Sequence, residues 1–412
     1  MHQMKAIEAA REVREKLLKL SGVIGIGHGW KRTAGRKTGT YAVVVYVREK
    51  RALAVIPRGE RIPRQVGGVT TDVIAHGAAH GRLEDEHAHR FRDHLKVHRE
   101  HVKATGGPRR PSSAHDVDIG QIAVIEDDPH RTFRMAGDDV DWIGAYRKFR
   151  LTHPDIYDFV TFWSDFPVEC DCGAFYCGLA NPARGINWEA CLAKGRRGWG
   201  TRRLQAFHYF IREDDAALMQ EVGHHWGAYA GFKTSPGDRQ VRFDYCLGNE
   251  PGHWSSYFDD DRSPMDYDES ELSLPIGVSA DWVENGDGTF TRRPVRQGGY
   301  AFCNLDLYLM GLIPPQEVGE FYYIARPQGR GQTIRGRRVP LSIQNVIRAN
   351  GARRPSAARS AKRFRQAFVL LTTDATRAHG RARHLDGLRQ RYERIFREAT
   401  GGRAEVDTRL AP

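Results

Sequence analysis

The sequence lacks any apolar run long enough to cross a membrane. No window approaches the ~20 consecutive apolar residues that a transmembrane helix needs. The N-terminal stretch 1–20 reads as a charged amphipathic helix without the apolar centre of a secretory signal peptide. We therefore expect a cytoplasmic protein with no membrane partner.

Cysteine is also scarce, with 6 among 412 residues. Cys170, Cys172 and Cys177 lie close together in the sequence, and Cys191 follows at some distance. Four thiolates can hold a structural zinc ion, although C-x-C-x4-C is not a usual zinc spacing. Buried thiols are the alternative in a reducing compartment, and disulfides are the alternative if the protein is exported.

Acidic residues are too few to balance the basic ones: 63 Lys and Arg against 51 Asp and Glu give a net charge of +12. The excess is scattered, and its densest clusters are residues 194–203 and 330–338. Each cluster could contact phosphates. No recognisable nucleic-acid-binding fold accompanies them, so we favour solvated loops. Nucleic acid remains a less favoured partner than a peptide or protein.

The chain is long enough to bury a large core and to form more than one unit. Residues 1–76 predict a small α/β module, because a helix is followed by alternating strands around a glycine-rich turn. The sequence disfavours a phosphate loop, since Arg36 stands where the glycine before Lys37 would be needed. The pattern GVIGIGHG, TGTYAVVVYV, IPR and TTDVI resembles the leader module ahead of trypsin-like domains in some bacterial proteins. That resemblance implies a docking or scaffolding module, and no GDSGG-like protease segment follows.

Residues 77–117 predict a His-rich, charged linker. Seven histidines lie from His76 to His101 inclusive, and His94, His98 and His101 fall on one helical face. We favour an exposed connecting helix that titrates near neutral pH. A face that binds a transition metal, as a store or delivery arm, is the alternative.

The most informative segment is LMQEVGHHW, at residues 218–226, which is close to the zinc-binding helix HExxH. In such a helix two imidazoles one turn apart face one metal ion, and the Glu beside the first acts as a base. Glu221 and His224 match this motif, whereas Gln220 replaces the first His. A carboxamide oxygen is a poorer zinc ligand than an imidazole nitrogen.

The residues around this segment favour a strand followed by the site helix. Asp214 and Asp215 supply a capping carboxylate and a favourable charge at the helix start. The apolar residues that follow are not confined to one stripe, so we expect a helix buried on most sides. The aromatic-rich run 203–211 predicts the preceding strand. This order is the one expected of a zincin.

The remaining metal ligands have to come from downstream. The third His of the longer metzincin motif falls on Ala230, which excludes that subclass. Glu250 is at a suitable distance along the chain, but a proline follows it directly and argues against a helix there. His253 is the better candidate, because His224, His253 and either Gln220 or a carboxylate would supply the three ligands of a catalytic zinc.

The resemblance extends beyond one motif. The segments YDFVTFWSDF, RGIN, QEVGHHWGAY, HWSSYFDDDRSPM, DWVENGDGTF, LDLYLMGL, IQNVIRANG and REATGGRAEVDT, in this order, resemble a set shared by uncharacterised bacterial proteins with an HExGHxW helix. This implies a zincin-like metallopeptidase domain over 118–412, including its basic C-terminal helix, with Glu221 as general base and His224 as ligand. The set normally has His at the position of Gln220. The expected class is α+β: a zincin-like domain with a mixed sheet and an active-site helix, preceded by a small α/β module.

Two functions follow from these observations. The first is a zinc-dependent metallopeptidase, in which Zn²⁺ lowers the pKa of a water molecule and Glu221 takes its proton as the peptide carbonyl is attacked. Tyr257 and His225 are candidate donors to the developing oxyanion. The alternative is a pseudopeptidase, whose cleft binds a peptide or partner without cutting it. Glu221 and His224 favour the enzyme, whereas Gln220 favours the pseudopeptidase.

Overall fold

The computed structural model describes residues 5–6, 9–10, 12–13, 16–17, 19–20, 23–33, 36–47, 50–75, 94–108, 116–127, 132–135, 139–168, 173–188, 195–211, 213–243, 252–259, 262–267, 281–293, 301–329 and 332–411. Within these ranges, no helix combines the length and apolarity that a membrane span requires.

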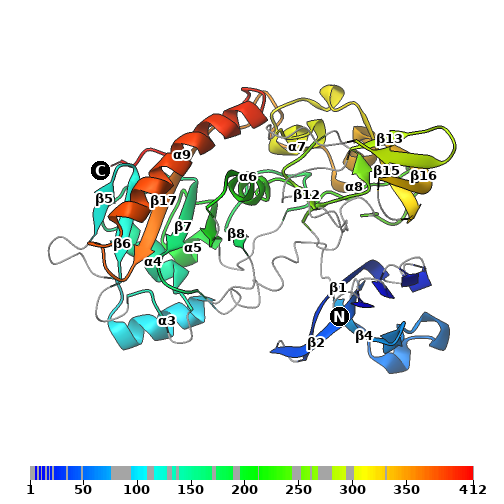
Figure 1. Cartoon of the computed structure of the whole chain (residues 1–412), viewed down its shortest axis with the longest axis horizontal. Coiled ribbons are helices and arrows are strands. Elements are labelled where there is room, and N and C mark those ends of the chain that lie inside the picture. Colours follow the sequence, from blue (N-terminus) through cyan, green and yellow to red (C-terminus); the bar gives the residue numbers. More distant parts are fainter. Residues whose placement is uncertain are drawn as a thin grey trace.

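The first unit is a four-stranded sheet in the order β1-β2-β4-β3 (Figure 1). Strands β2 and β4 are parallel, and the other neighbours are antiparallel. Two short 3-10 helices, η1 and η2, lie between β2 and β3. The apolar side chains of the sheet form a cluster of their own with helical residues Ala9, Ala10 and Leu17. The elements are β1 (Val23–Thr33), β2 (Arg36–Val47), η1 (Leu53–Val55), η2 (Arg58–Glu60), β3 (Gln65–Val66) and β4 (Val69–Ala75).

The largest sheet has the order β5-β6-β17-β7-β9-β8, and β18 also pairs with β17. Its interior strands β6, β17, β7 and β9 are parallel, whereas β5 and β8 are antiparallel edge strands. The sheet is therefore mixed, as the sequence predicted. The strands are β5 (Val117–Ile119), β6 (Ile122–Glu126), β7 (Phe159–Ser164), β8 (Ala174–Gly178), β9 (Ala206–Phe210), β17 (Arg363–Thr372) and β18 (Glu405–Asp407).

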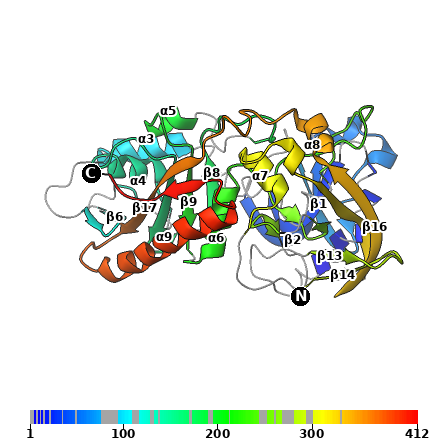
Figure 2. The same cartoon turned by 90° about the horizontal axis from the view of Figure 1, so that it is seen from above.

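Helices cover both faces of this sheet (Figure 2). Alternate residues of β17 enter different cores: Phe368 and Leu370 pack on one face, and Val369 and Leu371 on the other. A strand buried on both faces reads as a continuous apolar run, which explains the FVLL sequence of β17. Helices α6 (Asp215–Gly223) and α9 (His379–Ala399) cover the first face; α3 (His94–Thr105), α4 (Trp142–Phe149) and α5 (Gly195–Trp199) cover the second.

A second, antiparallel sheet has the order β11-β15-β16-β14-β13. Strands β13 and β14 form a hairpin whose turn contains Gly286 and Gly288, both with positive φ. Apolar residues of this half and of the large sheet belong to one hydrophobic core. The elements of this half are β10 (Trp254–Ser255), β11 (Phe258–Asp259), β12 (Asp266–Tyr267), β13 (Trp282–Glu284), β14 (Thr289–Arg292), α7 (Asn304–Met310), η3 (Pro315–Glu317), β15 (Glu320–Gln328), β16 (Thr333–Ser342) and α8 (Ile343–Asn350).

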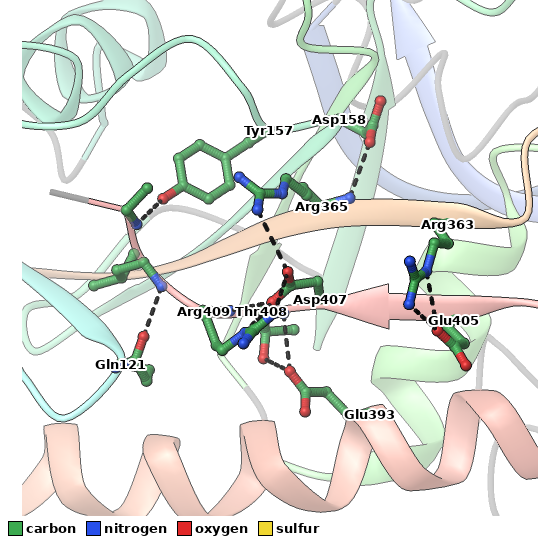
Figure 3. Close-up of polar contacts among 12 residues, drawn as sticks. Gln121, Tyr157, Asp158, Arg363, Arg365, Glu393, Glu405, Asp407, Thr408 and Arg409 are labelled. Atoms are coloured by element: carbon green, nitrogen blue, oxygen red, sulfur yellow. Dashed lines mark hydrogen bonds and ion pairs between the residues drawn. The ribbon is translucent and has the colours of Figure 1, made fainter.

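The C-terminal strand β18 is fastened to the large sheet by polar contacts (Figure 3). Arg363 pairs with Glu405 at 3.1 Å, and the backbone N–H of Leu410 donates to the side chain of Gln121. The hydroxyl of Thr408 donates to Glu393 on α9. The C-terminal segment therefore packs as part of the domain.

Helix α3 differs from the exposed linker helix that we expected. The structure describes residues 94–108 and 116–117 of the predicted linker, and there His98 is buried. The Nδ1 atoms of His98 and His101 lie 2.6 and 3.0 Å from one carboxylate oxygen of Asp141, the N-cap residue of α4. Burial raises the pKa of Asp141, but the hydrogen bonds from His101 and His98 outweigh it and hold that pKa well below its usual range. A buried carboxylate therefore faces these two histidines.

Candidate metal centre

Helix α6 carries the HExxH-like segment and begins where the sequence predicted. Asp214 has an extended backbone and accepts a 2.7 Å hydrogen bond from the N–H of Ala217, which caps the helix. The backbone stays helical at His224, whose N–H donates to the carbonyl of Gln220 at 3.1 Å. Positions 220 and 224 are therefore one turn apart on the same side of the helix. Residues 217–223 are all buried.

His253 reaches the end of this helix from the loop before β10. The ring centroids of His224 and His253 are 4.9 Å apart, and the rings are nearly perpendicular. Both side chains are buried, with exposed fractions of 2% and 3%. The structure thus brings together the two imidazoles that the sequence proposed as ligands of one metal ion.

His224 is held in its neutral form. Burial, reinforced by the neighbouring His253 and His208, lowers the pKa of His224 well below its usual range. Its Nε2 atom has no hydrogen-bond partner among the residues that the structure describes. A neutral imidazole with an uncommitted nitrogen is the state in which histidine binds metals.

The other two residues of the motif are also buried. Gln220 is 4% exposed and Glu221 is 7% exposed. Successive helix residues are separated by ~100° around the axis, so Glu221 faces a different direction from Gln220 and His224. This is the relation between base and ligands in an HExxH helix.

His225, in contrast, has hydrogen-bond partners at both of its ring nitrogens. Its Nδ1 lies 3.0 Å from the hydroxyl of Tyr176, and its Nε2 lies 3.2 Å from the Oε1 of Gln205. The amide of Asn181 donates to its backbone carbonyl at 2.5 Å. His225 is therefore a structural residue that fixes the end of α6 against β8. The other proposed oxyanion donor, Tyr257, packs against Trp282 with ring centroids 6.3 Å apart.

Sequence reasoning missed His208, which lies on β9. Its Nδ1 is 3.2 Å from the hydroxyl of Thr161, whereas its Nε2 has no hydrogen-bond partner in the described ranges. Complete burial lowers the pKa of His208 to about 3. The ring of Tyr176 has its centroid 5.7 Å from that of His208 and 6.2 Å from that of His224. An alternating pattern marks His208 as a strand residue but does not indicate what its side chain meets.

Sequence reasoning also missed Asp306, at the start of α7. Its carboxylate accepts a 2.9 Å hydrogen bond from the indole N–H of Trp254 and a 2.5 Å one from the hydroxyl of Ser263. Burial raises the pKa of Asp306, and the hydrogen bonds from Ser263, Trp254 and Cys303 oppose that rise. In the sequence, Asp306 stands three residues after Cys303, the N-cap of α7, and this position indicates a capping role but no contact with Trp254.

Among the remaining candidate ligands, Cys177 alone lies in the described ranges. Cys177 is buried in β8, whereas Cys170, Cys172, Cys191 and Glu250 lie outside the described ranges. Among the residues that are described, no group of three or more His, Cys, Asp or Glu side chains is arranged to hold a metal ion. Within the described ranges, the candidate centre comprises two imidazoles, with Gln220 and Glu221 on the helix beside them.

A comparison with protein-family models and with curated proteins finds no match to this chain. The function of the protein is therefore inferred from the geometry of the site.

Proposed function

We propose that this chain is a zinc-dependent metallopeptidase-like protein that acts on a peptide or protein substrate. The observation that carries the proposal is the 4.9 Å separation of the His224 and His253 ring centroids at the end of helix α6. The mixed sheet, followed by a helix with Glu221 beside the ligand positions, supports a zincin-like domain over 118–412.

The donor atoms fit a borderline metal ion such as Zn²⁺. Imidazole nitrogens suit zinc, whereas calcium and magnesium prefer several oxygen ligands. His224 is neutral and its Nε2 is not engaged by any described residue, so no hydrogen bond has to be broken there. Gln220, one turn before His224, would supply a carboxamide oxygen as a weaker third ligand.

Each residue of the site then has a separate role. A zinc ion bound by His224 and His253 would supply Lewis-acid chemistry. Glu221 would accept the proton of the attacking water and return it to the leaving amine. His225, paired with Tyr176 and Gln205, would keep the end of α6 in position.

One observation favours a second candidate function, a pseudopeptidase that binds a peptide or partner without cutting it. The described residues supply two imidazoles and no third His, Cys, Asp or Glu ligand. Gln220 stands where a third imidazole would complete the set. An incomplete set of ligands weakens zinc binding, which favours recognition without hydrolysis.

Two substitutions separate these functions. Gln220→His restores the pair of imidazoles one turn apart, so it should raise zinc affinity and any hydrolysis of an unstructured protein substrate. Glu221→Gln removes the base but no ligand, so it should abolish hydrolysis and leave zinc binding largely intact. A Gln220→His variant that binds no more zinc than the wild type and cuts nothing would exclude the enzyme and favour the binding protein.

A further inference from the structure

Asp306 joins helix α7 to the loop that carries His253. Its Oδ1 accepts from the indole N–H of Trp254, and its Oδ2 accepts from the hydroxyl of Ser263. The backbone N–H of Cys303 also donates to Oδ2, at 3.3 Å, as part of the cap of α7. Both carboxylate oxygens of Asp306 therefore accept hydrogen bonds, and the residue is only 2% exposed.

Asp306 accepts hydrogen bonds from two parts of this loop, at Trp254 and at Ser263. Trp254 directly follows His253, and its backbone N–H donates to the carbonyl of Met265 at 2.8 Å. The hydroxyl of Ser263, which donates to Asp306, accepts a 2.9 Å hydrogen bond from the N–H of Met265. One carboxylate thus fixes both β10, beside His253, and the segment before β12.

The loop also packs against the site helix. Met265 lies against Gly223, the last residue of α6, and both side chains of the His224–His253 pair are buried at the same end of that helix. A shift of the loop relative to α7 would therefore change the distance between the two imidazoles. Asp306 touches neither imidazole in the described contacts, so it would act through Trp254.

We infer that Asp306 is a positioning residue for His253, and that its hydrogen bond to Trp254 sets the metal affinity of the site. This inference rests on the proposed metal centre. Outer residues that orient metal ligands alter metal affinity by roughly 10–100-fold when they are removed. Because Asp306 acts through the neighbour of His253, we expect the lower end, about tenfold.

The test is a competition titration of the full chain with Zn²⁺ against a chromophoric chelator. Asp306→Asn keeps the side-chain shape but turns an NH₂ group either to the indole N–H of Trp254 or to the donors Ser263 and Cys303, so this set of hydrogen bonds cannot stay intact. Trp254→Phe keeps a buried aromatic ring but removes the indole N–H. Each should weaken zinc binding about tenfold. The double variant should bind nearly as the weaker single variant does, because both substitutions remove one shared hydrogen bond.

Two matched control variants show how much zinc affinity falls when a buried residue outside the site is changed. Asp141→Asn alters another buried helix-capping carboxylate, and Trp199→Phe alters a buried indole whose N–H has no hydrogen-bond partner within the described part of the chain. Both should lower thermal stability without changing zinc affinity. If they weaken zinc binding as much as Asp306→Asn does, the positioning role is overturned.

The outcomes also separate this inference from the proposed function. A wild-type chain that binds no zinc would overturn the metal centre itself. A wild type that binds zinc, with Asp306→Asn and Trp254→Phe folded and within twofold of it, would overturn the positioning role alone. If Asp306→Asn does not fold, Trp254→Phe decides by the same criterion.

Discussion

Gly223 lies so close to Met265 that a β-carbon at position 223 would stand 2.3 Å from the Met265 sulfur. Glycine is otherwise unfavourable inside a helix by about 0.5–1 kcal/mol relative to alanine. The close approach explains why the site helix ends in glycine. It also lets the loop that carries His253 lie directly against α6.

We therefore predict that Gly223→Ala destabilises the protein. Overpacking of a buried site costs about 1–3 kcal/mol, which exceeds the gain in helix propensity. The measurement is the free energy of unfolding in urea. Gly387→Ala in α9 is the control, since its β-carbon would meet nothing closer than 3.9 Å, and it should stabilise the protein. Equal effects of both substitutions would show that Met265 does not restrict position 223.

The pH dependence of stability should report the buried His208. The unfolded chain binds a proton below the ordinary histidine pKa of 6.5, whereas burial lowers the pKa of His208 in the folded chain to about 3. The titration of His208 therefore does not lower the free energy of unfolding above pH 6.5. Below that pH the unfolded chain gains a proton that the folded chain does not, so the free energy of unfolding falls as the pH drops from 6.5 toward 3. At pH 5 the loss is about 2 kcal/mol.

His208→Asn keeps a polar atom near Thr161 and removes the titration. The free energy of unfolding of this variant should fall less steeply between pH 6.5 and 5 than that of the wild type. His224 and His225 act in the same direction, so part of the slope should remain. An unchanged slope in the variant would mean that the pKa of His208 is not lowered in the folded chain.

Helix α3 should depend on its contact with Asp141. His98→Ala removes a buried hydrogen bond to a carboxylate, and we expect a loss of about 1.5–3 kcal/mol. His384→Ala, which removes an exposed histidine beside Glu213, should have little effect. Hydrogen exchange of the backbone over residues 94–105 would detect release of the helix. Full protection in the His98→Ala variant would contradict the assigned contact.

Local patterns were enough to predict the elements around the site. The aromatic run at 203–211 contains β9, and Asp214 caps α6. These features depend on residues within a few positions of each other, which explains why sequence patterns carry them.

Long-range pairings were harder to predict. The parallel strand β17 lies between β6 and β7, although more than half of the chain separates it from β6 and nearly half separates it from β7. The contacts of His98 with Asp141 and of Trp254 with Asp306 likewise join distant segments. His253 was the exception, because the chemistry of a zinc site required a second imidazole and few histidines were available. At Gln220 the surrounding sequence predicts a zinc-binding helix, whereas the side chain is a poor zinc ligand.

The central claim is that His224 and His253 bind one zinc ion, and a double-mutant cycle on zinc affinity tests it most directly. The four proteins are the wild type, His224→Ala, His253→Ala and the double variant, with His384→Ala as control. Each single substitution should weaken binding more than the roughly tenfold expected of an outer residue, and the double variant should be hardly weaker than the worse single variant. A His253→Ala variant that binds zinc as tightly as the wild type would contradict the account.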